Sequence, residues 1–168
     1  MTNKSSRSPI LLALTSAVAL CSAVALADTV ARYVILDNDG EPTVRDDLTG
    51  LEWQQVASTD GPLDWKSALA HCEGLSYGGN DDWHLPSVNE LSSIVDEKKA
   101  EAPAINTTYF VGFEPATGYW TATTSRISGT AAYVVYFNDQ NSTVGRGGVS
   151  TVSKTANHHP LCVRREGG

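Results

Sequence analysis

The sequence predicts an α+β fold in which two helices lie beside a short-stranded antiparallel sheet. Three observations support this class. Short β-rich segments separated by turn residues come first, two capped segments with helical periodicity follow, and several short strands come last. This order of elements is typical of helices packed on an antiparallel sheet, because a parallel sheet would alternate strands and helices regularly.

Three short strands begin the predicted fold. Residues 32–36 form a β-rich run that ends in the turn residues of 37–40, Asp-Asn-Asp-Gly. A second strand is expected around 42–45, and Thr49-Gly50 makes the next turn. Residues 51–56 alternate apolar and polar side chains, which predicts a half-buried third strand. Hairpins of this kind favour antiparallel pairing.

Two helices follow. Asp64 is a predicted N-cap, and apolar residues follow it at helical spacing up to Leu75. The segment 81–91 predicts a buried extended anchor that turns into a second helix, because Pro86 excludes a helix at the residue before it. Ser87 and Glu90 form a capping-box pattern. We expect this helix to close at Lys98-Lys99, where cations favour a helix C-terminus.

The remaining chain predicts short strands. Residues 119–124 and 131–137 are strands, and 161–164 form a short last strand. The segment 142–154 is rich in Gly, Ser and Thr, and we interpret it as weakly β and mainly loop-like. The four tryptophans lie inside apolar patterns, which predicts core packing for them.

Residues 1–27 are typical of a secretory signal peptide, and 28–168 would form a single domain. Lys4 and Arg7 precede an apolar run, and Ala25-Leu26-Ala27 makes a cleavage site. A lipoprotein signal at Cys21 is the alternative, although Leu20 stands where a small residue is preferred. The protein is therefore expected in the periplasm, at the cell surface or in the medium, with no transmembrane segment in the mature chain.

Cys72 and Cys162 are the two cysteines left after the signal peptide. In an exported protein such a pair is expected to form a disulfide. The bond would close a loop of about 90 residues, which the chain-entropy model values at about 4–5 kcal/mol.

Charge is distributed unevenly along the chain, whose formal net charge is −7. From residue 120 onward there are five basic and two acidic residues, which could meet an anionic partner, unless the charges mix once the chain folds. Nucleic acid is not expected, because an exported protein without a dense basic stripe does not fit that class. The candidate ligand-binding residues are Arg126, Asn141, Arg146, Lys154 and His158.

No cofactor is expected. Calcium is a weaker possibility raised by Asp37, Asp39 and Glu41, but Pro42 occupies the place of the invariant glycine of an EF-hand loop. The spacing of His158 and His159 near Cys162 gives no zinc signature. No nucleophile motif or acid–base constellation can be assembled, so the sequence does not predict an enzyme.

A series of short motifs runs through the chain in a fixed order. They are Asp37–Gly40, Thr49–Trp53, Trp65, Ala68–Ala70, Cys72, Asp81–Pro86, Glu90-Leu91, Pro103–Asn106, Tyr109-Phe110, Tyr119-Trp120, Tyr133–Phe137 and Cys162–Arg164. In this order the motifs resemble the Lcl C-terminal domain family. The resemblance covers nearly all of 28–168, although the family usually has Arg where this chain has His84.

The resemblance implies a C-type-lectin-like fold related to the formylglycine-generating-enzyme group. Family members are secreted or surface-exposed bacterial proteins, and the namesake is an adhesin that binds sulfated glycosaminoglycans. No catalytic residues are carried over. The first functional hypothesis is therefore an adhesin-like module that binds an anionic polysaccharide or host glycan. The alternative is a structural or assembly subunit of a surface complex that binds envelope proteins.

Overall fold

The structure, a computed structural model, describes residues 31–57, 61–114, 116–138 and 147–165. The predicted signal peptide and two candidate ligand residues, Asn141 and Arg146, lie outside the described residues. The described part contains two helices, two small antiparallel sheets and one disulfide, which confirms the predicted α+β class. The strands divide between two sheets, whereas the sequence suggested one.

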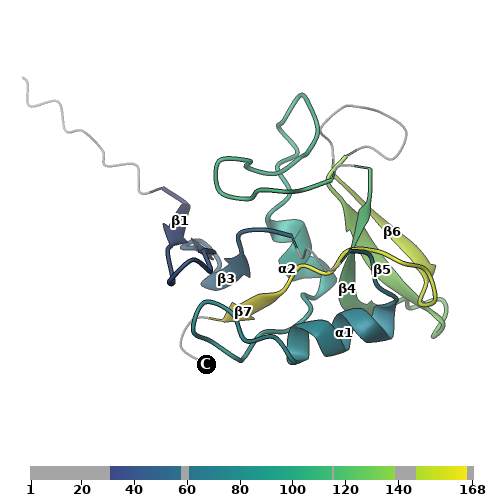
Figure 1. Ribbon diagram of the computed structural model, residues 1–168. Coiled ribbons are helices and arrows are strands. Elements are labelled where there is room, and N and C mark those ends of the chain that lie inside the picture. The colour runs from purple at the N-terminus through teal and green to yellow at the C-terminus, as the bar shows by residue number, and fades with distance from the viewer. Residues whose placement is uncertain (1–30, 58–60, 115, 139–146, 166–168) are drawn as a thin grey trace, which may run out of the picture. The chain divides into compact units, whose positions relative to one another are not determined.

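The first sheet has the order β1-β2-β3-β7, and all its pairs are antiparallel. Its strands are β1 (Tyr33–Leu36), β2 (Thr43–Asp46), β3 (Leu51–Gln54) and β7 (Val163–Arg165). Positive φ angles at Asp39 and Gly40 reverse the chain between β1 and β2. The last strand therefore pairs with a strand from the start of the domain, and Figure 1 shows β7 running beside β3.

The second sheet has the order β4-β5-β6, with β4 (Gly118–Thr124), β5 (Ala131–Tyr136) and β6 (Gly148–Ser153). All six residues of β6 pair with β5, so our loop-like interpretation was wrong for 148–153. The segment has few bulky side chains, and its extended conformation comes from pairing with β5, which local composition does not reveal.

Both predicted helix starts are confirmed. Helix α1 (Trp65–Glu73) begins after Asp64, whose carboxylate accepts a hydrogen bond from the Ser67 N–H. Helix α2 (Val88–Ser93) begins after Ser87, and the full capping box with Glu90 is present. Helix α1 packs on β4, whereas α2 packs on both β4 and β5 (Figure 1).

The predicted end of the second helix was wrong. Helix α2 ends at Ser93, so Lys98 and Lys99 lie beyond it. The Ser93 hydroxyl donates to the Glu90 carbonyl, and the Asp96 N–H donates to the Ala104 carbonyl at 2.8 Å. This second bond ties the chain after α2 to a segment that helical periodicity does not include.

The core joins the two sheets through their inner faces. Trp53, Trp83 and Trp120 are fully or almost fully buried, which confirms core packing for three of the four tryptophans. Cys72 of α1 and Cys162, one residue before β7, form the predicted disulfide inside the core, with 90 residues of sequence separation. The bond fixes α1 to the end of the chain.

Candidate functional site

Two of the predicted ligand residues, Arg126 and Lys154, lie at the same end of the second sheet. Arg126 is exposed in the turn between β4 and β5. Lys154 follows β6, and its backbone N–H donates to the Thr130 carbonyl of that turn at 2.9 Å. We call residues 124–130 and 153–155 the basic end.

The side chain of Lys154 is held in place. Its Nζ donates to Thr124 Oγ1 at 2.9 Å and lies 3.8 Å from the centroid of the Trp65 ring. Trp65 is half-buried, and its Nε1 donates to the Thr121 carbonyl at 2.8 Å. Cation–π contact and a hydrogen bond therefore fix a positive charge at a defined position on the surface.

Hydroxyl groups surround these cations. Exposed hydroxyl pairs join Ser128 to Thr130 at 2.8 Å and Ser153 to Thr155 at 2.9 Å. In the described stretches 116–138 and 147–165 there is no Asp or Glu. The carboxylate of Asp64, the N-cap of α1, accepts a hydrogen bond from the Ser67 N–H of that helix. The basic end thus offers donors to an anion with little competing negative charge.

His158 lies away from the basic end. Its ring contacts Trp120 at 4.9 Å and Tyr136 at 6.2 Å between centroids, near the start of β4 rather than its end at Thr124. Burial, and secondarily the neighbouring His159, lowers the pKa of His158, so its imidazole is neutral near pH 7. The structure does not bring this residue together with Lys154.

The segment 81–91 has a structural role. Arg164 donates through Nη1 to Glu52 Oε2 and through Nε to Asp82 Oδ1 at 2.6 Å. Glu52 also accepts from the Thr43 hydroxyl, and both Glu52 and Arg164 are buried. Arg164 is therefore occupied within the fold, and Asp82 of the motif serves as its partner.

Position 84 of the motif is held through the backbone. His84 and Val163 exchange both backbone hydrogen bonds, at 2.9 and 3.0 Å. The His84 Nε2 lies 3.8 Å from Glu90 Oε2, next to the start of α2. The connection between the motif and β7 therefore runs through the backbone and does not require a particular side chain at position 84.

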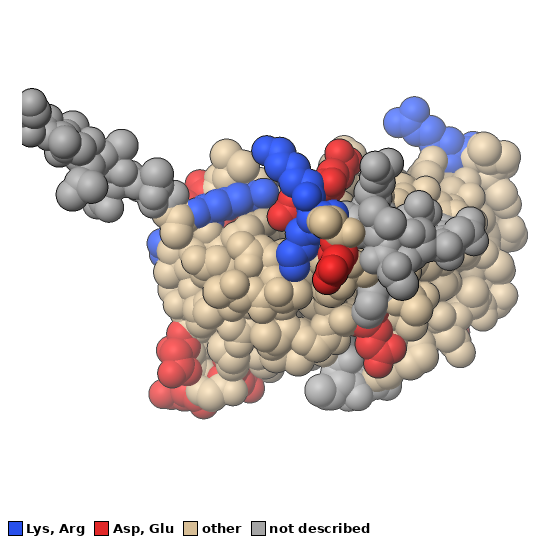
Figure 2. Space-filling view, turned by 90° about the horizontal axis from the view of Figure 1, so that it is seen from above, with Lys and Arg blue, Asp and Glu red and all other residues tan. Residues whose placement is uncertain are grey.

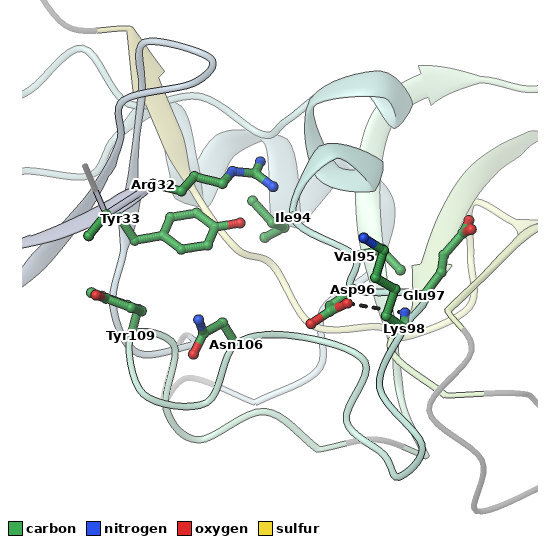
Figure 3. A pocket seen from close by; sticks show the side chains of 10 residues that line it. Arg32, Tyr33, Ile94, Val95, Asp96, Glu97, Lys98, Asn106 and Tyr109 are labelled. Carbon is green, nitrogen blue, oxygen red and sulfur yellow. Dashed lines mark hydrogen bonds between the residues drawn. The ribbon is translucent and has the colours of Figure 1, made fainter. Parts of the chain in front are cut away.

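A cleft that the sequence did not predict opens beside the first sheet (Figure 3). Its volume is about 720 Å³. Its walls come from three segments: the start of β1, the chain that follows α2, and the loop before Phe110. The lining residues are Ala31, Arg32, Tyr33, Ile94, Val95, Asp96, Glu97, Lys98, Asn106 and Tyr109.

Arg32 forms one wall of the cleft and is fully engaged. Its guanidinium donates to both carboxylate oxygens of Asp46, at 2.9 and 2.7 Å, and to the Ser93 carbonyl at 2.8 Å. It also lies 4.7 Å from the centroid of the Tyr33 ring. Burial raises the pKa of Tyr33 to about 12, so its hydroxyl remains protonated.

Two of the three carboxylates considered for calcium accept backbone hydrogen bonds. Asp37 accepts from the Gly40 N–H, and Glu41 accepts from the Gly78 N–H at 2.8 Å. Among the described residues, no group of three or more His, Cys, Asp or Glu side chains is arranged to hold a metal ion. Asp37, Asp39 and Glu41 line one small surface pocket together with Gly78 and Gly79.

The cleft was missed because none of its three wall segments carries a motif that is typical of a binding site. One local signal was present in the sequence. The side chain of Asn106 accepts from the Thr108 N–H, and an Asn at this position is typical of such a turn. Its meeting with Tyr33 depends on tertiary folding. Sequence periodicity cannot show such a meeting.

The comparisons with known proteins agree with these motifs. A sequence model of the Lcl C-terminal domain matches residues 42–164. No curated protein matches the chain. None of the helices in the described residues is long and apolar enough to cross a membrane. Because the match covers well over half of the sequence, the chain belongs to the Lcl C-terminal domain family.

Proposed function

We propose that this protein is an exported, non-catalytic, adhesin-like module that binds an anionic glycan at its basic end. One observation carries the proposal. In a protein with a net charge of −7, the described parts of the second sheet and its turns bear cations and hydroxyl groups but no carboxylate. Such a surface attracts anions while the acidic remainder of the protein repels them.

The chemistry of the basic end suits sulfate or carboxylate groups. Arg126 can bind an oxyanion through two parallel N–H donors, whereas Lys154 supplies a fixed point charge next to the Trp65 ring. The exposed hydroxyls of Ser128 and Thr155 can donate further hydrogen bonds. Binding of this ionic kind weakens as salt screens the charges.

The shifted carboxyl groups support a non-catalytic role. Those of Asp46, Asp64, Asp82 and Glu90 all have pKa values below the ordinary range. A general acid needs the opposite shift, toward the working pH. These groups are therefore suited to ion pairs and helix caps.

Heparin affinity chromatography tests the proposal. Wild type should be retained at low salt and elute earlier as salt rises, and the double variant Arg126→Gln/Lys154→Gln should bind at least ten-fold more weakly, because two charge-assisted hydrogen bonds are lost. Lys99→Gln is the matched control, since its cation bonds Thr107 outside the basic end. Absence of retention, or equal loss in both variants, would overturn the proposal.

An assembly subunit that binds protein partners remains the alternative. It predicts a continuous exposed apolar patch. The large apolar side chains that are exposed in the described residues belong to five different segments: Ile35, Leu48, Val111, Ile127 and Val149. Single exposed apolar residues on separate segments are common on protein surfaces, and they do not by themselves indicate an interface.

A further inference from the structure

The cleft beside β1 differs from the basic end in its charge. Two cations, Arg32 and Lys98, line it together with the carboxylates of Asp96 and Glu97. Arg32 is already neutralised by Asp46, whose side chain is fully buried. Figure 2 shows the same mixture on the face seen there, where Lys and Arg side chains lie among Asp and Glu side chains. An anion would therefore gain little in this cleft.

The polar groups of the cleft combine donors and acceptors. The side-chain oxygen Oδ1 of Asn106 accepts from the Thr108 N–H at 3.1 Å. This bond orients the side-chain amide so that its NH₂ group can donate to a ligand. Asp96 uses one carboxylate oxygen for the Lys98 N–H, leaving the other as an acceptor. Figure 3 shows the side chains of Tyr33, Asn106 and Asp96 at the border of the same cleft.

These three groups are held by different parts of the fold. Tyr33 is buried in the core except for 8% of its surface, so its hydroxyl emerges from a fixed ring. The Asp96 backbone N–H donates to the Ala104 carbonyl. The backbone carbonyl of Asn106 accepts from the N–H groups of Tyr109 and Phe110. Prearranged polar groups of this kind recognise a ligand without first losing conformational entropy.

Tyr109 adds an aromatic surface. Its ring is half-buried, and its centroid lies 5.4 Å from that of Tyr33 with the planes tilted by 47°. The apolar C–H face of a pyranose ring packs on such a surface, while its hydroxyls both donate and accept hydrogen bonds. The volume also lies within the range of about 300–1,000 Å³ that is usual for small-molecule sites.

We propose that the cleft formed by Tyr33, Asp96, Asn106 and Tyr109 is a second carbohydrate site, which takes an uncharged sugar residue. A neutral polyol satisfies a mixture of donors and acceptors, whereas a cation would need acceptors alone. Binding there does not depend on the basic end and is insensitive to salt, because no net charge of the ligand is involved.

The experiment is a titration of the full mature chain, followed by two-dimensional amide NMR. The probes are chitotriose, cellotriose, maltotriose and mannotriose, each at 25 and 500 mM NaCl. At least one should shift the amide signals of Asp96, Asn106 and Tyr109, with a dissociation constant that changes less than two-fold between the two salt concentrations.

Variants then separate the two sites. Tyr33→Phe removes only a hydroxyl and should weaken binding of the trisaccharide about five- to ten-fold, as expected for one lost hydrogen bond. Tyr109→Ala should weaken it at least ten-fold. Both should keep wild-type retention on heparin, which also shows that they are folded. Arg126→Gln/Lys154→Gln should bind the trisaccharide like wild type.

Three results would overturn the cleft proposal. The first is that none of the four trisaccharides perturbs these amide signals. The second is that the Tyr33 and Tyr109 variants bind like wild type. The third is that tetramethylammonium displaces the trisaccharide, which would identify a cation site. If the protein binds a trisaccharide in the cleft but is not retained on heparin, the cleft proposal stands and the proposed function fails. If heparin retains the protein but no trisaccharide has an effect, the proposed function stands and the cleft proposal fails.

Discussion

The two sheets use charge in opposite ways. In the first sheet, Glu52 and Asp46 are buried, and each is paired with an arginine, Arg164 and Arg32. In the second sheet, the described strands and turns have no carboxylate, and the cation of Lys154 rests on an aromatic ring at the surface. One sheet thus satisfies its charges internally, whereas the other presents them to solvent.

This difference separates residues that stabilise the fold from residues that can bind a ligand. Breaking a buried ion pair leaves an uncompensated charge in the protein interior, which costs several kcal/mol. Removing a cation from the surface costs little. The pair of Asp82 and Arg164 therefore stabilises the fold. Variants in the first sheet should lower the free energy of unfolding, whereas variants at the basic end should weaken ligand binding.

The largest expected effect concerns the bond that joins the regions. Cys72→Ala/Cys162→Ala removes the disulfide between α1 and the start of β7. Because the bond closes a loop of 90 residues, we expect the free energy of unfolding to fall by about 4–5 kcal/mol. Urea unfolding monitored by tryptophan fluorescence measures it, and a loss below about 1 kcal/mol would contradict the expectation.

Breaking the buried network of the first sheet should come next. Glu52→Gln leaves the buried Arg164 with Asp82 as its one remaining carboxylate partner among the described residues. We expect the free energy of unfolding, measured in urea at pH 7, to fall by about 3 kcal/mol. Glu73→Gln is the matched control because Glu73 is exposed at the end of α1. If the two variants unfold at the same urea concentration, the first sheet does not depend on its buried charge.

Acid should weaken the first sheet through Asp46. Burial alone would raise the pKa of this carboxyl, but hydrogen bonds from Arg32 and the Leu48 N–H outweigh it and lower the pKa below its ordinary value. Its contribution is therefore complete above the unfolded-state pKa of about 3.9 and is lost as pH falls through the folded-state pKa.

Asp46→Asn should accordingly cost about 2 kcal/mol at pH 7, the loss of charge-assisted hydrogen bonds. The gap between wild type and variant in free energy of unfolding should narrow when urea titrations are repeated at pH 4, 3 and 2.5. A gap that stays constant over this range would show that the carboxylate charge is not what Asp46 contributes.

The smallest effect is expected at the basic end. Arg126→Gln/Lys154→Gln should change the free energy of unfolding by about 1 kcal/mol or less, because Arg126 is exposed and Lys154 loses only one cation–π contact and one exposed hydrogen bond. The same urea titration measures this. A loss as large as that of Glu52→Gln would show that both regions rely on charge for stability.

Much of the fold could be predicted because its signals are local. Asp64 and Ser87 cap the helices by hydrogen bonds within three residues, and Pro86 marks the boundary between anchor and helix. The disulfide followed from the two cysteines of an exported chain. Each of these inferences depends on residue chemistry that acts over a short stretch or on a simple count.

The errors and omissions depend on distant contacts. Strand β6 forms because it pairs with β5. The chain beyond α2 leaves the helix, and its Asp96 N–H donates to the Ala104 carbonyl. The cleft unites Tyr33 with Asn106, more than seventy residues away in sequence. Of the candidate ligand residues, Arg126 and Lys154 lie at the same end of a sheet, but His158 packs against Trp120 elsewhere.

The turn between β4 and β5 is closed by the backbone. Ser125 donates its N–H to the Ala131 carbonyl at 2.8 Å, and Ala131 donates to the Ser128 carbonyl at 3.1 Å. Because the Ser125–Ala131 bond lies outside residues 126–129, these four residues can be exchanged or lengthened while that bond keeps the strand ends together, and doubling such a loop costs only about 0.6 kcal/mol in closure entropy. This makes the turn a natural position for a loop library, in which new binding specificities are selected on an unchanged, disulfide-stabilised scaffold.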